Sequence, residues 1–132
     1  MKQYHLKLPW PPTNNTLFSV VNGRKIKSEK GRIFTEAVIN QITKANQQFN
    51  LSGKLKIKIV ANPPDLRKRD LDNLLKAPLD ALTQSGVIAD DSMFKSIKIG
   101  WGEKVKGGSL DITIWEIEDV HWHRSSNWRM QI

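Results

Sequence analysis

The chain has 132 residues, no cysteine and a formal net charge of +8, from 21 basic and 13 acidic residues. This length favours one domain, 39% hydrophobic residues exclude wholesale disorder, and the lack of cysteine excludes disulfides and thiolate zinc sites. With no signal-peptide pattern and no run long enough for a bilayer, a soluble cytoplasmic protein is expected, and its positive charge favours a nucleic-acid partner.

The first predicted element is a strand over residues 3–8, where apolar and polar side chains alternate. Prolines and asparagines within residues 9–15 end it, because proline cannot continue a strand ladder. Residues 13–32 are predicted to form a loop. A run of basic residues in this loop can either contact DNA phosphates or form a solvated face, and the two interpretations are equally plausible. The run consists of Arg24, Lys25, Lys27, Lys30 and Arg32.

A helix is predicted next, capped near Ser28 and stopped by residues 51–53. Its apolar residues recur at helical spacing: Phe34, Ala37, Val38, Ile42, Ala45 and Phe49. Residues 54–60 then alternate strictly between lysines and aliphatic side chains, which predicts a half-buried strand with a basic outer face.

A second helix is predicted over roughly residues 71–85, with Gly86 as its C-cap. Pro78 falls within it and should kink the helix if it lies deep inside. Two more strands are predicted over residues 92–101 and 109–117, joined by a hairpin connection, and residues 118–132 show no clear period.

The predicted order is therefore β-α-β-α-β-β in a single domain covering residues 1–132. Two helices cannot cover both faces of a four-stranded sheet. The expected fold class is α+β, with a mixed four-stranded sheet and two helices mainly on one face.

The most informative stretch is "RKRDLDNLLKAPLDALTQSGVIADD", residues 67–91. Asp70 and Asp72 lie where a loop enters the second helix, and Asp91 follows that helix and can return toward them. Three carboxylates are hard oxygen ligands suited to Mg²⁺ or Mn²⁺, which can activate water and stabilise a leaving oxygen of a phosphodiester. The basic residues before them would hold phosphates: Arg67, Lys68 and Arg69. Lys76, one turn after Asp72, would stabilise developing negative charge.

Simpler interpretations remain open. Asp70 or Asp72 can merely cap the helix, Asp72 can form an i,i+4 ladder with Lys76 and Asp80, and Asp90 and Asp91 can be turn residues. Elsewhere, histidines in a polar tail are usually solvated, and tryptophans in strand patterns favour a core or interface position over a base-stacking platform. The residues concerned are His121, His123, Trp101 and Trp115.

From about Tyr4 to Ile117 the chain resembles the RusA-type Holliday junction resolvases, small endonucleases often associated with prophages. The resemblance rests on the order and spacing of four motifs: "LPWPPTNN" (8–15), "RKRDLDNLLKAPLDAL" (67–82), "GVIADD" (86–91) and "KGGSLDITI" (106–114). The tail from Glu118 onward lies outside it, and Pro78 is a departure that puts the straightness of the second helix in question.

The resemblance implies a homodimer that binds four-way DNA junctions and makes paired nicks with Mg²⁺ or Mn²⁺ in recombination and repair. It also implies that Asp70, Asp72 and Asp91 are metal-binding catalytic residues and that Lys76 is a functional lysine. Arg69 and the basic residues before it match the DNA-contacting run. The alternatives are a less selective metal-dependent DNA nuclease and a non-catalytic nucleic-acid-binding protein.

Overall fold

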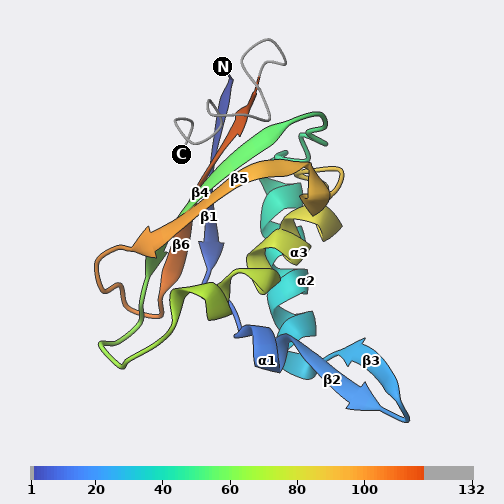
Figure 1. Cartoon of the computed structure of the whole chain (residues 1–132), viewed down its shortest axis with the longest axis vertical. Helices are drawn as coiled ribbons and strands as arrows, with labels where there is room; N and C mark the ends of the chain where they lie inside the picture. The colour runs from blue at the N-terminus through green and yellow to red at the C-terminus, as the bar shows by residue number, and fades with distance from the viewer. Residues whose placement is uncertain (1, 118–132) are drawn as a thin grey trace.

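A mixed four-stranded sheet forms the centre of the computed structural model, which describes residues 2–117 (Figure 1). The strands follow the order β1-β6-β4-β5. Neighbours β1 and β6, and β6 and β4, pair antiparallel, whereas β4 and β5 pair parallel. The strands are β1 (Gln3–Pro9), β4 (Leu55–Asn62), β5 (Phe94–Trp101) and β6 (Ser109–Glu116). The predicted α+β class and mixed four-stranded sheet are confirmed.

Strict alternation in the sequence explains why one face of this sheet is buried. In β4 the aliphatic side chains of Leu55, Ile57 and Ile59 are fully buried, while the intervening lysines point to the other face. The neighbouring strands add further aliphatic side chains to the same core: Leu6, Leu8, Leu110, Ile112 and Ile114.

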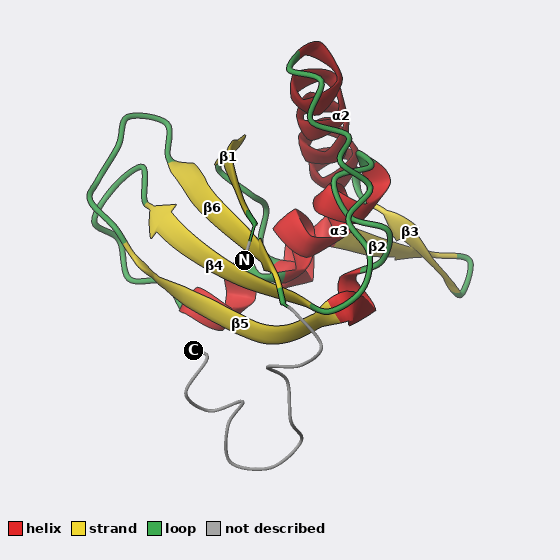
Figure 2. Ribbon diagram, turned by 90° about the horizontal axis from the view of Figure 1, so that it is seen from above, coloured by secondary structure: helices red, strands yellow, loops and turns green. Residues whose placement is uncertain are grey.

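Helices α2 (Glu29–Lys44) and α3 (Lys76–Gln84) both lie on this buried face (Figure 2). The predicted cap of α2 is confirmed, since Ser28 Oγ accepts a hydrogen bond from the Gly31 amide at 3.0 Å. The helix ends at Lys44, earlier than predicted, because Asn46 adopts a left-handed conformation with φ of 54°.

The predicted helix over 71–85 is divided in two. A short 3₁₀ turn, η1 (Leu71–Leu74), precedes α3, which begins at Lys76. Pro78 is therefore the third residue of α3, in the first turn, where a backbone N–H has no intrahelical acceptor to lose. The expected kink inside a longer helix does not arise, and Gly86 follows the C-cap Ser85 with φ of 85°.

The predicted loop over residues 13–32 is wrong. It contains a four-residue helix, α1 (Asn14–Leu17), and a hairpin of β2 (Phe18–Val21) and β3 (Arg24–Lys27) that projects from the body (Figure 1). Asn22 and Gly23 join the two strands with φ of 52° and 75°. Two positive φ angles are what a tight two-residue hairpin turn requires, and Asn-Gly is the pair that adopts them most readily.

The predicted hairpin between β5 and β6 is also wrong, because β4 lies between these strands. The segment that joins β5 to β6 therefore crosses the end of β4. The short 3₁₀ turn η2 (Asp91–Met93) precedes β5, which pairs with β4 on the side away from β6. In the part of the chain that the structure describes, no helix has the length and apolar character needed to cross a membrane.

Trp10, which follows β1, packs directly on Gly108, which precedes β6. A Cβ placed on Gly108 would lie 2.9 Å from three atoms of the Trp10 side chain, and Gly108 has φ of +74°. Its neighbour Gly107 has a similar φ of +79° but no atom within 4 Å of such a Cβ. Only at Gly108 does the absence of a side chain allow Trp10 to take its place.

We therefore expect Gly108→Ala to destabilise the fold more than Gly107→Ala. Both variants place a Cβ at positive φ, which costs about 1 kcal/mol. Gly108→Ala must also displace the indole of Trp10, at about 1–3 kcal/mol more. Urea unfolding of the two variants isolates the packing contribution, and equal free energies of unfolding would contradict it.

Candidate active site

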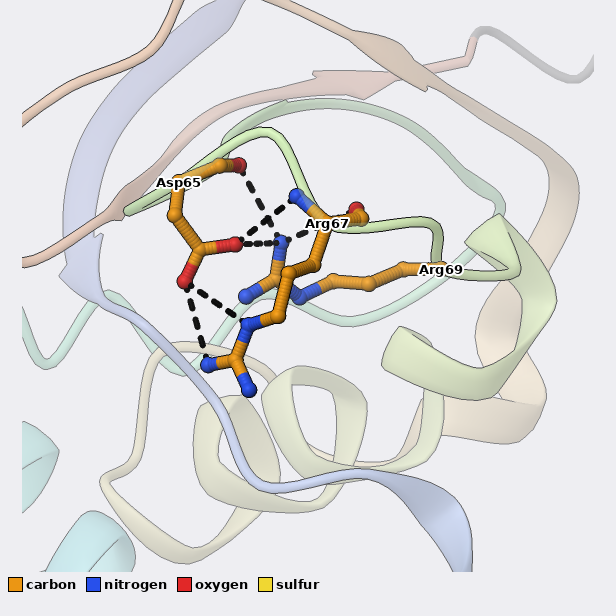
Figure 3. A network of polar contacts seen from close by, with 3 residues as sticks. All are labelled: Asp65, Arg67 and Arg69. Carbon is orange, nitrogen blue, oxygen red and sulfur yellow. Dashed lines mark hydrogen bonds and ion pairs between the residues drawn. The ribbon is translucent and has the colours of Figure 1, made fainter.

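The basic loop that follows β4 is organised around one carboxylate, Asp65 (Figure 3). Arg67 donates to its Oδ2 from Nε at 3.2 Å and from Nη2 at 3.1 Å. Arg69 Nη1 lies 2.8 Å from Oδ1 of the same carboxylate. Asp65 thus holds two guanidinium groups side by side immediately before Asp70.

The two arginines differ in how far their side chains are exposed to solvent. The Arg69 side chain is 19% exposed, donates to the carbonyl oxygens of Asp65 and Arg67, and lies 5.5 Å from the centre of the Trp10 ring. The Arg67 side chain is 81% exposed, and Lys68 is exposed as well. Arg69 therefore fixes the loop from inside, while Arg67 and Lys68 present charge to the solvent.

The two arginines should keep Asp65 ionised at low pH. The hydrogen bonds from Arg69 and then Arg67 hold the pKa of Asp65 far below its usual value. A carboxylate with a depressed pKa in the folded state stabilises the fold above its unfolded pKa, and this contribution is lost as pH falls toward the folded value. In a carbon-13 NMR titration, Arg69→Ala should move the Asp65 pKa back up; an unchanged pKa would contradict the assigned cause.

Asp70 and Asp72 are not used by the fold. Asp70 occupies the N-cap position of η1, yet its side chain makes no capping hydrogen bond. Both residues are exposed, and within residues 2–117 neither carboxylate takes part in a hydrogen bond or ion pair. Neither acid caps a helix with its side chain, so the interpretation of Asp70 or Asp72 as a helix cap is wrong.

Asn14 was not predicted as a site residue, but it connects η1 to the first residue of α3. Its Nδ2 donates to the backbone oxygen of Asp72 at 3.1 Å, and its Oδ1 accepts from the backbone N–H of Lys76 at 3.1 Å. Asn14 therefore fixes the backbone on which Asp72 and Lys76 are displayed. The sequence feature that could have identified Asn14 is its position in the motif "LPWPPTNN". In the fold, Asn14 of this motif hydrogen-bonds residues of the segment "RDLDNLLK".

Asp90 and Asp91 have different environments. Asp90 is the N-cap of η2, and its Oδ1 accepts from the Ser92 amide at 3.2 Å, so its role as a turn residue is confirmed. Loss of solvent around its carboxyl, the neighbouring carboxyl of Asp90 and the charge of Asp80 raise the pKa of Asp91. Asp91 therefore lies in a region of negative potential.

The proposed ladder of Asp72, Lys76 and Asp80 is not formed. Asp80 instead pairs with Lys27, whose Nζ lies 2.5 Å from its Oδ2 and also donates to Thr35 at 3.3 Å. Lys27 thus ties the hairpin to α2 and α3. Arg24 and Lys25 at the other end of β3 are exposed, so their predicted contact with DNA remains sterically open.

The donor set at this site fits a hard divalent cation in its chemistry. Carboxylate oxygens are the ligands that Mg²⁺ and Mn²⁺ prefer. Loss of solvent is the largest cause of the raised pKa of Asp91, and a cation would offset the smaller contributions of Asp90 and Asp80. In the described residues, no three acidic or histidine side chains are already arranged to hold a metal. Within residues 2–117 the structure therefore does not bring Asp70, Asp72 and Asp91 together as a three-ligand site, although all three carboxylates are exposed.

Two other sets of predicted residues lie elsewhere. Trp101 is 45% exposed and does not belong to the core. Trp115 is half-buried on β6, with Lys56 Nζ 4.8 Å from its ring centre. His121 and His123, with the whole segment 118–132, lie outside the described residues.

Comparison with known proteins gives a consistent result. A family model described as "Endodeoxyribonuclease RusA" matches residues 9–115. The crossover junction endodeoxyribonuclease rusA of Enterobacteria phage HK97 is 38% identical over 120 residues, which cover 91% of this chain and all of that protein. The proteins of the same name from Enterobacteria phage 82 and Escherichia coli K12 are each 38% identical over 117 residues, 89% of this chain and 98% of theirs.

Proposed function

The chain belongs to the RusA family of endodeoxyribonucleases, and from this premise we propose that it resolves four-way DNA junctions by paired nicks, in DNA recombination and repair. The observation that carries the proposal is the position of Asp70 and Asp72. Two exposed carboxylates without a hydrogen-bond or ion-pair partner in the described part of the chain follow a loop of three basic residues. Unused acids beside phosphate-binding cations are what a phosphodiesterase requires and a passive binding module does not.

The chain's own residues have separate roles in this proposal. Arg67 and Lys68 would hold a backbone phosphate near Asp70, while Arg69 keeps the loop in place. A divalent cation held by Asp70, Asp72 and Asp91 would supply the Lewis acid and the acidified water that phosphodiester hydrolysis needs. Lys76, exposed in the first turn of α3, would stabilise negative charge on the leaving oxygen. The exposed Arg24 and Lys25 would contact a more distant phosphate.

The active form would be a homodimer. A junction is resolved by two nicks in strands of like polarity, and one chain carries one such set of acids. A twofold dimer presents two equivalent sites with the symmetry of the junction. Sedimentation at micromolar concentration should give twice the mass of one chain; paired nicking by a monomer would contradict this assembly.

The decisive experiment compares three DNA substrates in Mg²⁺: a four-way junction, a flap and a linear duplex of the same sequence. We expect symmetrical nicks in the junction alone and affinity that falls steeply with salt, because phosphate contacts dominate binding. Comparable cleavage of all three substrates would favour a less selective nuclease. Binding without cleavage in either Mg²⁺ or Mn²⁺ would identify a non-catalytic binding protein.

Asn14 provides a test of positioning within this site. Asn14→Ala removes both hydrogen bonds to the η1 segment, whereas Asn14→Asp keeps the acceptor for the Lys76 amide and loses the donor to Asp72. We expect nicking to fall about 10- to 100-fold in the alanine variant, as for residues that orient metal ligands, with junction affinity in EDTA retained.

The matched control is Asn15→Ala, because Asn15 is exposed in the same short helix and forms no side-chain hydrogen bond within residues 2–117. It should nick at the normal rate. If Asn14→Ala does so too, the two hydrogen bonds do not position the site.

A further inference from the structure

A groove of about 370 Å³ lies between the basic loop and the end of β5. Its volume is within the range of small-ligand sites, on the order of 300–1,000 Å³. Its lining combines apolar side chains with cationic ones. The lining residues are Pro63, Asp65, Leu66, Arg67, Lys68, Arg69, Trp101 and Gly102.

Trp101 presents an exposed indole to this groove. It is the register partner of Ala61, so its side chain leaves the sheet on the face where Ala61 is buried. Trp101 is the last residue of the edge strand β5 and remains 45% exposed. The next residue, Gly102, donates its amide to Ala61 O at 2.8 Å, and a Cβ there would lie 2.0 Å from Asn62 Oδ1. The backbone beneath the indole is therefore held close against β4.

The rest of the wall combines apolar surface with excess positive charge. Leu66 is 83% exposed and contributes an accessible aliphatic side chain to the lining of the groove. Asp65 fixes Arg67 through two N–H donors, and Lys68 adds a further cation. Three basic residues face one acid, so the wall stays cationic after Asp65 is neutralised.

We propose that this groove binds an unstacked nucleotide at the branch point, next to the phosphate to be cleaved. The proposal rests on the proposed function. The base would stack on Trp101 and contact Leu66, while Arg67 and Lys68 would hold its phosphate. The loop leads directly into Asp70, so the bound nucleotide lies close to the proposed catalytic acids.

Such a groove would distinguish branched from linear DNA. Bases inside a duplex are stacked on both faces and must be extruded, at an energetic cost, before they can reach a protein platform. Bases at a branch point are more readily unstacked. Trp101 therefore adds affinity for the junction that a linear duplex does not gain.

The test measures binding in EDTA and nicking in Mg²⁺ for Trp101→Ala, Trp101→Phe and Leu66→Ala in the full chain. Stacking of one base is worth on the order of tenfold or more in affinity. Trp101→Ala should therefore bind the junction about tenfold more weakly and bind the linear duplex normally. Trp101→Phe should recover most of the loss. The control is Ile97→Ala, a 42% exposed apolar residue of the same strand that does not line the groove.

A second measurement locates the base directly. Junctions carrying 5-iodouracil at the branch or within an arm are irradiated with the wild-type protein, and the crosslinked peptide is identified by mass spectrometry. We expect a crosslink to Trp101 from the branch position only. Leu66→Ala, whose exposed side chain is not needed for folding, should lower junction affinity in the same selective way as Trp101→Ala.

The two proposals fail separately. Wild-type protein that neither binds nor nicks the junction would overturn the proposed function. Normal junction affinity in Trp101→Ala and Leu66→Ala, or an equal loss on linear duplex, would overturn the groove alone. A crosslink to Trp101 from the arm position would also overturn it.

Discussion

Asparagine at Asp70, Asp72 or Asp91 should abolish most junction cleavage and leave junction binding intact. Each change keeps the size of the side chain, removes one negative charge and raises the formal net charge from +8 to +9. Changing a residue that only orients a metal ligand costs 10- to 100-fold, so loss of a ligand itself should cost at least about a hundredfold in nicking rate.

Binding measured in EDTA should be retained or strengthened, because carboxylates facing a phosphate backbone repel it when no cation intervenes. The same comparison separates catalytic acids from caps and salt-bridge partners. Asparagine caps a helix as well as aspartate does, so purely structural acids would lose little stability and no activity.

The matched control for the charge is Asp111→Asn. Asp111 is exposed on β6 and accepts a hydrogen bond from Asn62 at 2.9 Å, which an asparagine oxygen can also accept. This variant has the same net charge as the others and should nick normally. Circular dichroism checks that all four variants fold, and near-normal nicking by Asp70→Asn or Asp72→Asn would remove these residues from the active site.

Removal of divalent cations should have an equally large effect on the wild-type chain. Cleavage in excess EDTA should be undetectable and should return on addition of Mg²⁺ or Mn²⁺, because the carboxylates alone cannot acidify water or neutralise the charge at phosphorus. Without DNA, binding of the cation to the folded state should also raise the free energy of unfolding, by about 2.7 kcal/mol at a cation concentration of one hundred times Kd, and so raise the thermal midpoint.

That stabilisation provides a readout independent of activity. It should be lost in Asp70→Asn and Asp91→Asn, and it should be kept in Asp111→Asn. Undiminished cleavage in EDTA would contradict a metal-dependent mechanism, and equal stabilisation of all variants would place the cation elsewhere.

The sequence alone predicted the features that depend on neighbouring residues. Alternation in residues 3–8 and 54–60 predicted strands, because side chains in a strand point to opposite faces in turn. Ser28 predicted a helix start, since a hydroxyl at this position satisfies a free amide. The hairpin was equally local, because Asn22–Gly23 is a strong turn signal, but the basic residues beside it were interpreted as a loop.

Only the tertiary structure decided which of the charged residues are already committed to the fold. Lys27 and Arg69 both belonged to the predicted DNA-binding set, yet Lys27 pairs with Asp80, 53 residues away, and Arg69 lies against Trp10 and Asp65. Asn14 reaches partners 58 and 62 residues away. Sequence periodicity predicts which side chains share a face of a helix or strand and which face is buried. Which distant side chain meets it depends on the path of the whole chain, including the insertion of β4 between β5 and β6.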